Sequence, residues 1–131
     1  MILLSAFLLK AYLLVVLVWN LGAVNLPLFR TKKEAFEWLT SSKKTIDVRK
    51  GNPHRGEFAV YLSGRKVLRM RIIKRETGRL NQVVQPDNYR LIIPSAVVID
   101  DALAYLRKLY EGYDGVFTAY YIVSLERAEN F

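Results

Sequence analysis

The sequence predicts an α+β protein, in which an N-terminal apolar helix precedes a small domain with a mainly antiparallel sheet and two helices. The first 29 residues contain a single charged side chain, Lys10, and form one apolar stretch. The remaining residues hold two segments with helical spacing of apolar side chains and several short segments typical of strands. Because these segments do not alternate regularly, antiparallel pairing is favoured. We therefore divide the chain into an apolar helix at residues 1–29 and a basic α+β domain at residues 30–131.

The apolar segment is rich in Leu and Ala and is long enough to cross a bilayer as one helix. Lys10 lies near the middle of residues 2–19, where a charge costs about 2.5 to 3.5 kcal/mol. A span shifted to residues 11–29 moves this charge to an edge but takes in two asparagines and a proline. Two interpretations therefore remain: a membrane span, and a helix buried in a soluble fold or in an oligomer interface.

The charges that follow the segment predict an orientation for the membrane-spanning alternative. Arg30, Lys32 and Lys33 flank its C-terminal end. Because cytoplasmic flanks carry an excess of Lys and Arg, residues 30–131 would then lie at the cytoplasmic face of a membrane. The buried alternative predicts a soluble cytoplasmic protein.

The domain is predicted to begin with a helix at about residues 32–41 and a strand at residues 45–49. Thr31 and Glu34 have the spacing of a capping box, and an apolar stripe follows them. A Gly-Asn-Pro sequence ends the strand. One helix and one strand are therefore predicted before the hairpin at residues 58–76.

A hairpin with strands at residues 58–61 and 66–76 has the most informative periodicity. Apolar and basic side chains alternate along its second strand, so one face is apolar and the other is basic. We predict a three-residue turn ending at Gly64, because a two-residue turn would place Phe58 and Val60 among the arginines. The predicted basic face consists of Arg65, Arg69, Arg71 and Arg75, with Tyr61 beside them.

The last third of the domain adds a connection, a strand, a helix and a final strand. Residues 77–88 are polar and predict a mobile connection, and residues 89–93 predict a strand that a proline ends. A helix at residues 100–111 would have Asp100 or, alternatively, Ser95 as its N-cap. The final strand follows an Asp-Gly turn, and its inward-facing side chains are predicted to be Phe117, Ala119, Tyr121, Val123 and Leu125.

Positive charge is concentrated in the middle of the chain. Residues 43–79 contain twelve Lys or Arg against three acidic residues, whereas residues 80–131 contain four basic and seven acidic residues. A concentrated basic region favours an anionic partner more strongly than a uniformly basic chain does.

The sequence contains no motif for catalysis, and we predict that the protein is not an enzyme. Cysteine is absent and His54 is the single histidine, which excludes thiol nucleophiles, serine triads and zinc sites with two histidines. Asp100 and Asp101 are adjacent, and a helix cap is their simplest role. We predict no cofactor and no metal site.

The favoured hypothesis is a binding module whose basic sheet face holds nucleic acid or another polyanion such as anionic lipid, with or without a membrane tether. Arginines two residues apart on a strand lie about 7 Å apart, comparable with phosphate spacing, and Tyr61 could stack on a base. Exposed arginines that only protect a sheet from aggregation are the simpler explanation. The predicted contacts are Arg65, Arg69, Arg71, Arg75 and Tyr61, with Lys43, Lys44, Arg49, Lys50 and Arg55 around them.

The alternative hypothesis belongs to a different class. It makes the chain a structural or assembly subunit, of a membrane complex or a virus particle, with the apolar segment at residues 1–29 as its main contact. Identical copies or other protein subunits would then be the partners. Loss of assembly on deletion of that segment would support this alternative.

Overall fold

The computed structural model describes residues 26–125, which form a five-stranded sheet and four helices. The sheet has the strand order β1-β3-β4-β5-β2, in which β1 and β3 are parallel and the other pairs antiparallel. The mixed α+β class is thereby confirmed. The strands are β1 Leu28–Arg30, β2 Ile46–Lys50, β3 Phe58–Ser63, β4 Lys66–Gly78 and β5 Phe117–Ser124. The helices are α2 Lys33–Thr40, α3 Leu80–Val83, α4 Tyr89–Ile92 and α5 Ile99–Leu109.

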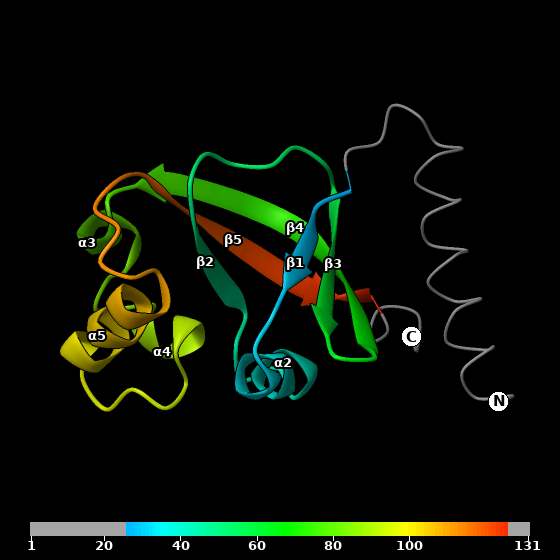
Figure 1. The fold of residues 1–131 in the computed structure, drawn as a ribbon, viewed down its shortest axis with the longest axis horizontal. Helices are drawn as coiled ribbons and strands as arrows, with labels where there is room; N and C mark the ends of the chain where they lie inside the picture. Colours follow the sequence, from blue (N-terminus) through cyan, green and yellow to red (C-terminus); the bar gives the residue numbers. More distant parts are fainter. Residues whose placement is uncertain (1–25, 126–131) are drawn as a thin grey trace, which may run out of the picture.

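The sheet is curled (Figure 1), and the side chain of Arg49 joins its edge strands β1 and β2. Arg49 of β2 donates hydrogen bonds to the carbonyl oxygen of Arg30, at 2.9 Å, and to Oγ1 of Thr31, at 3.2 Å. These bonds occupy backbone and side-chain groups at two edges that would otherwise be open to another strand.

The inner face of the curled sheet packs against α2. Its core is a cluster to which β1, β3, β4 and β5 all contribute apolar side chains. The cluster consists of Phe29, Phe36, Leu39, Ala59, Tyr61, Leu68, Met70, Ile72, Tyr120 and Ile122.

The outer face is covered unequally. Over β2 and β5 the helices α3, α4 and α5 form a second core, which we call the covered half; Figure 1 shows these helices gathered at one end of the molecule. Sheet residues Ile46, Val48, Phe117 and Ala119 pack there against Leu106 and its neighbours. None of the four described helices covers the outer face of β1, β3, the first part of β4 and the end of β5 around Val123, which we call the open half.

The turn between β3 and β4 has two residues, so the predicted three-residue turn is wrong. Ser63 pairs with Lys66, which leaves Gly64 and Arg65 in the turn. Gly64 has φ of 58°, a conformation that glycine adopts without the steric penalty of a side chain. The predicted left-handed glycine is therefore correct, but the strand register differs from the predicted one.

This register places apolar side chains of β3 among the arginines. Val60 lies opposite Arg69 and Phe58 lies opposite Arg71. The prediction excluded this arrangement because it assumed a uniformly polar outer face. The face is mixed instead, since Leu28 of β1 pairs with Val60 and extends the apolar row.

Two further predictions about elements are wrong. Residues 89–93 contain the short helix α4 in place of a strand, because Tyr89, Ile92 and Ile93 have helical spacing and pack against the second core. Residues 77–88 contain the end of β4 and the helix α3. The strand β1 was not predicted, and it begins at Leu28, inside the segment assigned to the apolar helix.

The two long helices begin with caps that differ from those predicted. Lys32 is the N-cap of α2 without a side-chain bond, and Oγ1 of Thr31 donates to the carbonyl oxygen of Phe29. Val98 is the N-cap of α5. The carboxylate of Asp101 accepts hydrogen bonds from the backbone N–H groups of Val97, at 3.0 Å, and Val98, at 3.2 Å, so Asp100 has no capping role.

No helix within residues 26–125 has the length and apolar character needed to cross a bilayer. The predicted apolar helix lies outside the described residues apart from its last four positions.

Candidate polyanion-binding face

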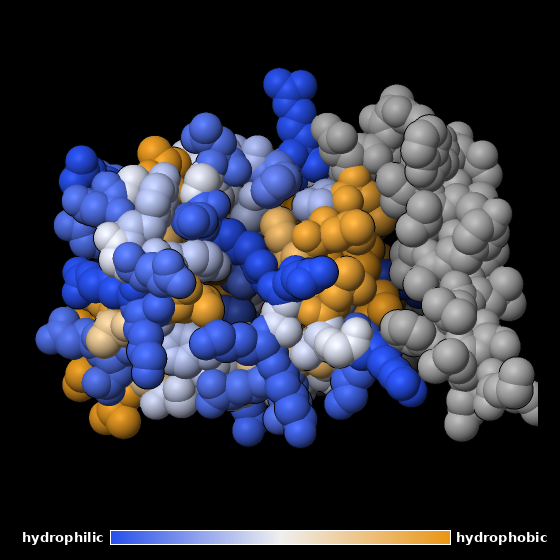
Figure 2. All heavy atoms as spheres, in the orientation of Figure 1, coloured by the Kyte–Doolittle hydropathy of each residue, from blue (hydrophilic) through white to orange (hydrophobic). Residues whose placement is uncertain are grey.

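The open half of the outer face mixes basic and apolar side chains. One row across the strands contains Leu28, Val60 and Arg69, and the next contains Phe58, Arg71 and Val123. The side chains of Arg69 and Arg71 are exposed, and Val60 at the centre is buried. Leu28 is 56% exposed, Val123 48% and Ile73 63%. Figure 2 shows apolar atoms gathered where Figure 1 places β1 and β3, with hydrophilic atoms around them.

The ion pair between Arg71 and Glu57 on this face is weakly held. Arg71 lies 3.0 Å from a carboxylate oxygen of Glu57, and both side chains are more than half exposed. Exposed pairs of this kind contribute about 0 to 1 kcal/mol, because water and salt screen them. An anionic partner can therefore compete for the Arg71 guanidinium. Arg65 is exposed in the turn at the end of the same strand.

Arg75 lies on the inner face, so its predicted place in the arginine row is wrong. The register with β5 shifts between Ile72 and Lys74, and the extra residue, Ile73, forms a β-bulge. A bulge exchanges the two faces for all later residues of the strand. Arg75 consequently lies opposite Tyr120, with its guanidinium 6.0 Å from the ring centre and bonded to backbone carbonyls of the β2–β3 loop.

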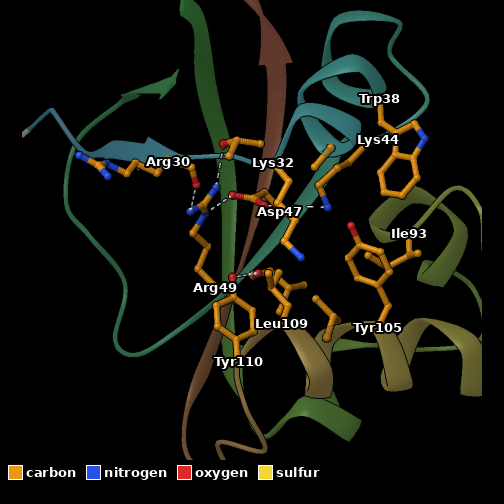
Figure 3. Close-up of a pocket in the computed structure, with 14 residues that line it drawn as sticks. Arg30, Lys32, Trp38, Lys44, Asp47, Arg49, Ile93, Tyr105, Leu109 and Tyr110 are labelled. Carbon is orange, nitrogen blue, oxygen red and sulfur yellow. Dashed lines mark hydrogen bonds and ion pairs between the residues drawn. The ribbon is translucent and has the colours of Figure 1, made fainter. Parts of the chain in front are cut away.

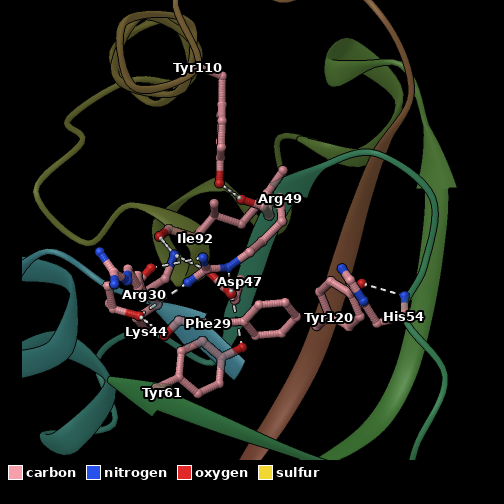
Figure 4. Close-up of polar contacts among 12 residues, drawn as sticks. Phe29, Arg30, Lys44, Asp47, Arg49, His54, Tyr61, Ile92, Tyr110 and Tyr120 are labelled. Carbon is pink, nitrogen blue, oxygen red and sulfur yellow. Dashed lines mark hydrogen bonds and ion pairs between the residues drawn. The ribbon is translucent and has the colours of Figure 1, made fainter. Parts of the chain in front are cut away.

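Tyr61 is fully buried and cannot stack on a base, which corrects its predicted role. Its hydroxyl donates a hydrogen bond to Oδ2 of Asp47 at 2.9 Å (Figure 4). Burial, together with the neighbouring Asp47 carboxylate, raises the pKa of the Tyr61 hydroxyl well above its ordinary value. The side chain therefore acts as a neutral structural donor inside the core.

Arg49 and Lys44, both predicted to widen the basic face, belong to a buried network around Asp47. Nε of Arg49 lies 2.7 Å from Oδ2 of Asp47, and its guanidinium lies 4.4 Å from the ring centre of Phe29. Burial opposes ionisation of Asp47, but the charges of Arg49 and Lys44 outweigh it, so the Asp47 pKa lies below its ordinary value.

Lys44 is the least compensated charge of that network. Its Nζ donates to the carbonyl oxygen of Ile92 and lies 3.9 Å from Oδ1 of Asp47. Burial lowers the pKa of Lys44 to about 8, although the Asp47 carboxylate acts in the opposite direction. A buried lysine whose pKa is lowered in this way is typical of a functional site or of an incompletely paired ion.

The three remaining predicted cations are exposed but lie outside the arginine row. Lys43 follows α2, Arg55 lies in the β2–β3 loop, and Lys50 ends β2 with its Nζ 5.5 Å from the ring centre of Tyr113. The structure therefore brings Arg65, Arg69 and Arg71 together on β4 and its turn, and it separates them from the other predicted residues.

Sequence reasoning missed a cavity beside the buried network. It has a volume of about 140 Å³ and lies between β2, α2 and α5, next to the junction of the two edge strands. Figure 3 shows Trp38 and Tyr105 on one side of it and Arg49 and Tyr110 on the other. Asp47, a carboxylate between the apolar residues Ile46 and Val48, was the one sequence signal for this region.

No protein-family model and no curated protein matches this chain. Two solved structures resemble it in fold. The crystal structure of hypothetical protein PH0355 has a TM-score of 0.61 and 17% identity, over 75% of this chain and 97% of that one. The solution structure of protein PF0455 from Pyrococcus furiosus has a TM-score of 0.57 and 19% identity, over 76% of this chain and 97% of that one. At these identities the likeness shows the fold alone.

Proposed function

We propose that this chain is a non-catalytic binding module whose open half holds a polyanion, and that this polyanion is the phosphate-bearing surface of an anionic membrane. The supporting observation is the alternation on that face, where Arg69 and Arg71 share rows with the exposed apolar side chains Leu28 and Val123. A lipid interface accommodates both kinds of side chain, because guanidinium groups pair with headgroup phosphates and apolar groups enter the acyl boundary.

The position of the apolar N-terminal sequence supports the same proposal. Residues 1–25 carry one charge, Lys10, and lead into β1, whose first residue, Leu28, lies on the open half. Stable membrane anchoring generally needs two signals, such as an apolar anchor and a basic patch. On this proposal the chain supplies both, and the domain lies at the cytoplasmic face of the membrane.

The burial of Tyr61 favours lipid over nucleic acid. Stacking on an aromatic side chain contributes about 1 to 3 kcal/mol per base in proteins that bind single strands. Among the described residues, the rows of the open half contain one aromatic side chain, Phe58, and it is half-buried. Nucleic acid would therefore be held by phosphate contacts alone.

Binding of the full-length protein to vesicles tests the proposal. Phosphatidylcholine vesicles with and without phosphatidylserine separate the electrostatic contribution from that of the apolar segment. A basic residue near an anionic surface contributes about 1 kcal/mol, so a variant with Gln at three arginines should lose about a hundredfold of the phosphatidylserine-dependent affinity. That variant carries R65Q, R69Q and R71Q.

A control variant with the same charge change removes three exposed cations from helices elsewhere on the domain, namely K33Q, R90Q and R107Q. The phosphatidylserine-dependent affinity of this control should fall less than about threefold, because these residues lie outside the open half. Equal losses in both variants would contradict the proposal. Salt-dependent binding to nucleic acid that only the first variant loses, without vesicle binding, would replace lipid by nucleic acid as the partner.

The exposed apolar residues also favour a second function, a structural or assembly subunit. Leu28, Ile73 and Val123 would then contact another protein subunit. Sizing of the full-length protein with V123D tests this candidate, because a charge at the contact should dissociate the assembly. An unchanged oligomer, or a monomeric protein before mutation, would exclude it.

A further inference from the structure

The cavity between β2, α2 and α5 has an excess of positive charge. Among its lining residues Lys32, Lys44 and Arg49 are cationic and Asp47 is anionic. The side chain of Arg30 points away from the cavity in Figure 3. A second carboxylate, that of Glu34, lies near Tyr105 and accepts a hydrogen bond from its hydroxyl at 3.2 Å. The cavity itself therefore contains three cationic groups and one anionic group.

The single carboxylate in the cavity is already hydrogen-bonded through one of its two oxygens. Oδ2 of Asp47 accepts from Nε of Arg49 and from the hydroxyl of Tyr61, and Lys44 lies 3.9 Å from Oδ1. That last distance is too long for a hydrogen bond, so Lys44 has an ionic contact without the directional bond that offsets burial. Within residues 26–125 its ammonium group makes one hydrogen bond, to the carbonyl oxygen of Ile92, and it has three N–H groups to donate.

The opposite wall of the cavity is apolar and aromatic. Tyr105, Leu106 and Leu109 of α5 line it together with Trp38 of α2. The rings of Trp38 and Tyr105 lie 6.0 Å apart between centres, which makes a continuous aromatic surface. A volume of about 140 Å³ is below the range of drug-sized pockets, so the cavity suits a ligand of a few heavy atoms.

We propose that this cavity binds a small organic carboxylate, with the carboxylate group on the ammonium of Lys44 and a flat apolar body against the wall formed by α5 and Trp38. The ligand carboxylate supplies the counter-charge that Asp47 provides only partly. A lysine ammonium also suits this role because, within the described part of the chain, one of its three N–H groups has a hydrogen-bond acceptor, whereas the guanidinium of Arg49 is held by three hydrogen bonds and an ion pair with Asp47. This site is separate from the open half, so its occupancy does not depend on membrane binding.

Titration of the full-length protein with benzoate tests the proposal, with calorimetry for affinity and NMR of the Trp38 indole N–H for location. Benzyl alcohol has a similar body without the charge, and acetate has the charge without the body. Benzyl alcohol should bind at least about tenfold more weakly than benzoate, because a charge-assisted hydrogen bond contributes about 1.5 to 3 kcal/mol. Acetate should also bind at least about tenfold more weakly, because it lacks the apolar ring, whose burial contributes about 1.5 to 3 kcal/mol. Equal binding of all three compounds, or no benzoate binding, would overturn the proposal.

Two lysine variants form the matched pair. K44M should weaken benzoate binding at least about tenfold, whereas K43M, which changes the exposed neighbour, should change it less than about twofold. A measurement on the unmodified protein complements the variants. Benzoate should raise the pKa of Lys44, which NMR of the lysine side chain measures directly. An unchanged Lys44 pKa at saturating benzoate would overturn the proposal even if K44M failed to fold.

Discussion

The two halves of the outer face of one sheet differ in what lies on them. Over β2 and β5, apolar side chains such as Phe117 and Ala119 are buried under α3, α4 and α5. On the open half, Leu28 of β1 and Val123 at the end of β5 remain about half exposed beside arginines of β4. Residues on the same face of β5 are therefore buried in a core at the start of the strand and half exposed at its end. The comparison shows that the helices over β2 and β5 bury side chains at one end of a strand whose other end is half exposed.

The largest expected effect compares one residue from each half of β5. F117A should lower the free energy of unfolding by about 3 to 5 kcal/mol, because Phe117 is 1% exposed within the second core. V123A should change it by less than about 0.5 kcal/mol, because Val123 is 48% exposed. Urea denaturation measures both values. Similar losses in the two variants would show that the open half is covered in the folded protein.

The second prediction concerns Lys44, which connects the start of β2 to the covering helix α4. Lys44, just before β2, bonds to the carbonyl oxygen of Ile92 in α4, and burial lowers its pKa to about 8 from 10.5. Between pH 8 and pH 10.5 the native state then holds fewer protons than the unfolded state, so this group makes stability rise with pH. Below pH 8 both states are protonated and the full penalty of burying the charge, about 3 kcal/mol, applies.

The K44M variant should lack this dependence. The difference in unfolding free energy between K44M and the unmodified protein should therefore shift by up to about 3 kcal/mol between pH 7 and pH 10.5, in favour of the unmodified protein at high pH. Denaturant unfolding at several pH values measures the shift. Loss of the bond to Ile92 adds a pH-independent offset, so the slope and not the absolute difference is diagnostic. A constant difference across this range would show that Lys44 titrates normally.

The smallest expected effect on stability lies in the open half. R69Q and R71Q should each change the free energy of unfolding by less than about 0.5 kcal/mol, because both side chains are exposed and the Arg71–Glu57 pair is screened. Thermal unfolding measures this value. A loss of 2 kcal/mol or more would mean that these arginines are structural, and it would remove the basis for assigning them to a partner.

The predicted exposure of the arginines on β4 is confirmed where strand periodicity alone decides it. Arg69 and Arg71 alternate with buried Leu68, Met70 and Ile72, and the structure exposes both arginines. The alternation is no longer informative after Ile73, because a β-bulge there exchanges the inner and outer faces of β4. Periodicity alone cannot indicate where such an extra residue is inserted. Arg75 was misplaced for that reason.

The predictions for Tyr61 and for the final strand failed for a related reason. The predicted three-residue turn placed Tyr61 on the face of the arginines, whereas the observed two-residue turn places it on the inner face. The predicted turn was chosen to keep Phe58 and Val60 away from the arginines, but the parallel neighbour β1 makes part of that face apolar. Along β5 both faces are buried near its beginning, so Phe117 and Ala119 of the predicted inward stripe are buried, and so is Tyr120, which was not predicted. Tyr121 and Leu125 are partly buried, and the prediction is wrong for Val123, which is 48% exposed. Local patterns do not contain the identity of the strand or helix that lies alongside.

The sequence by itself determined the α+β class, the hairpin that forms β3 and β4, the concentration of basic residues near it and the apolar character of residues 1–29. These properties depend on composition and on short-range periodicity, which the backbone geometry of strands and helices converts directly into faces. Only the tertiary structure decided that Asp47 gathers Lys44, Arg49 and Tyr61 into a buried network beside a cavity. Those contacts depend on how the sheet curls and which helices cover it, and these are properties of long-range packing.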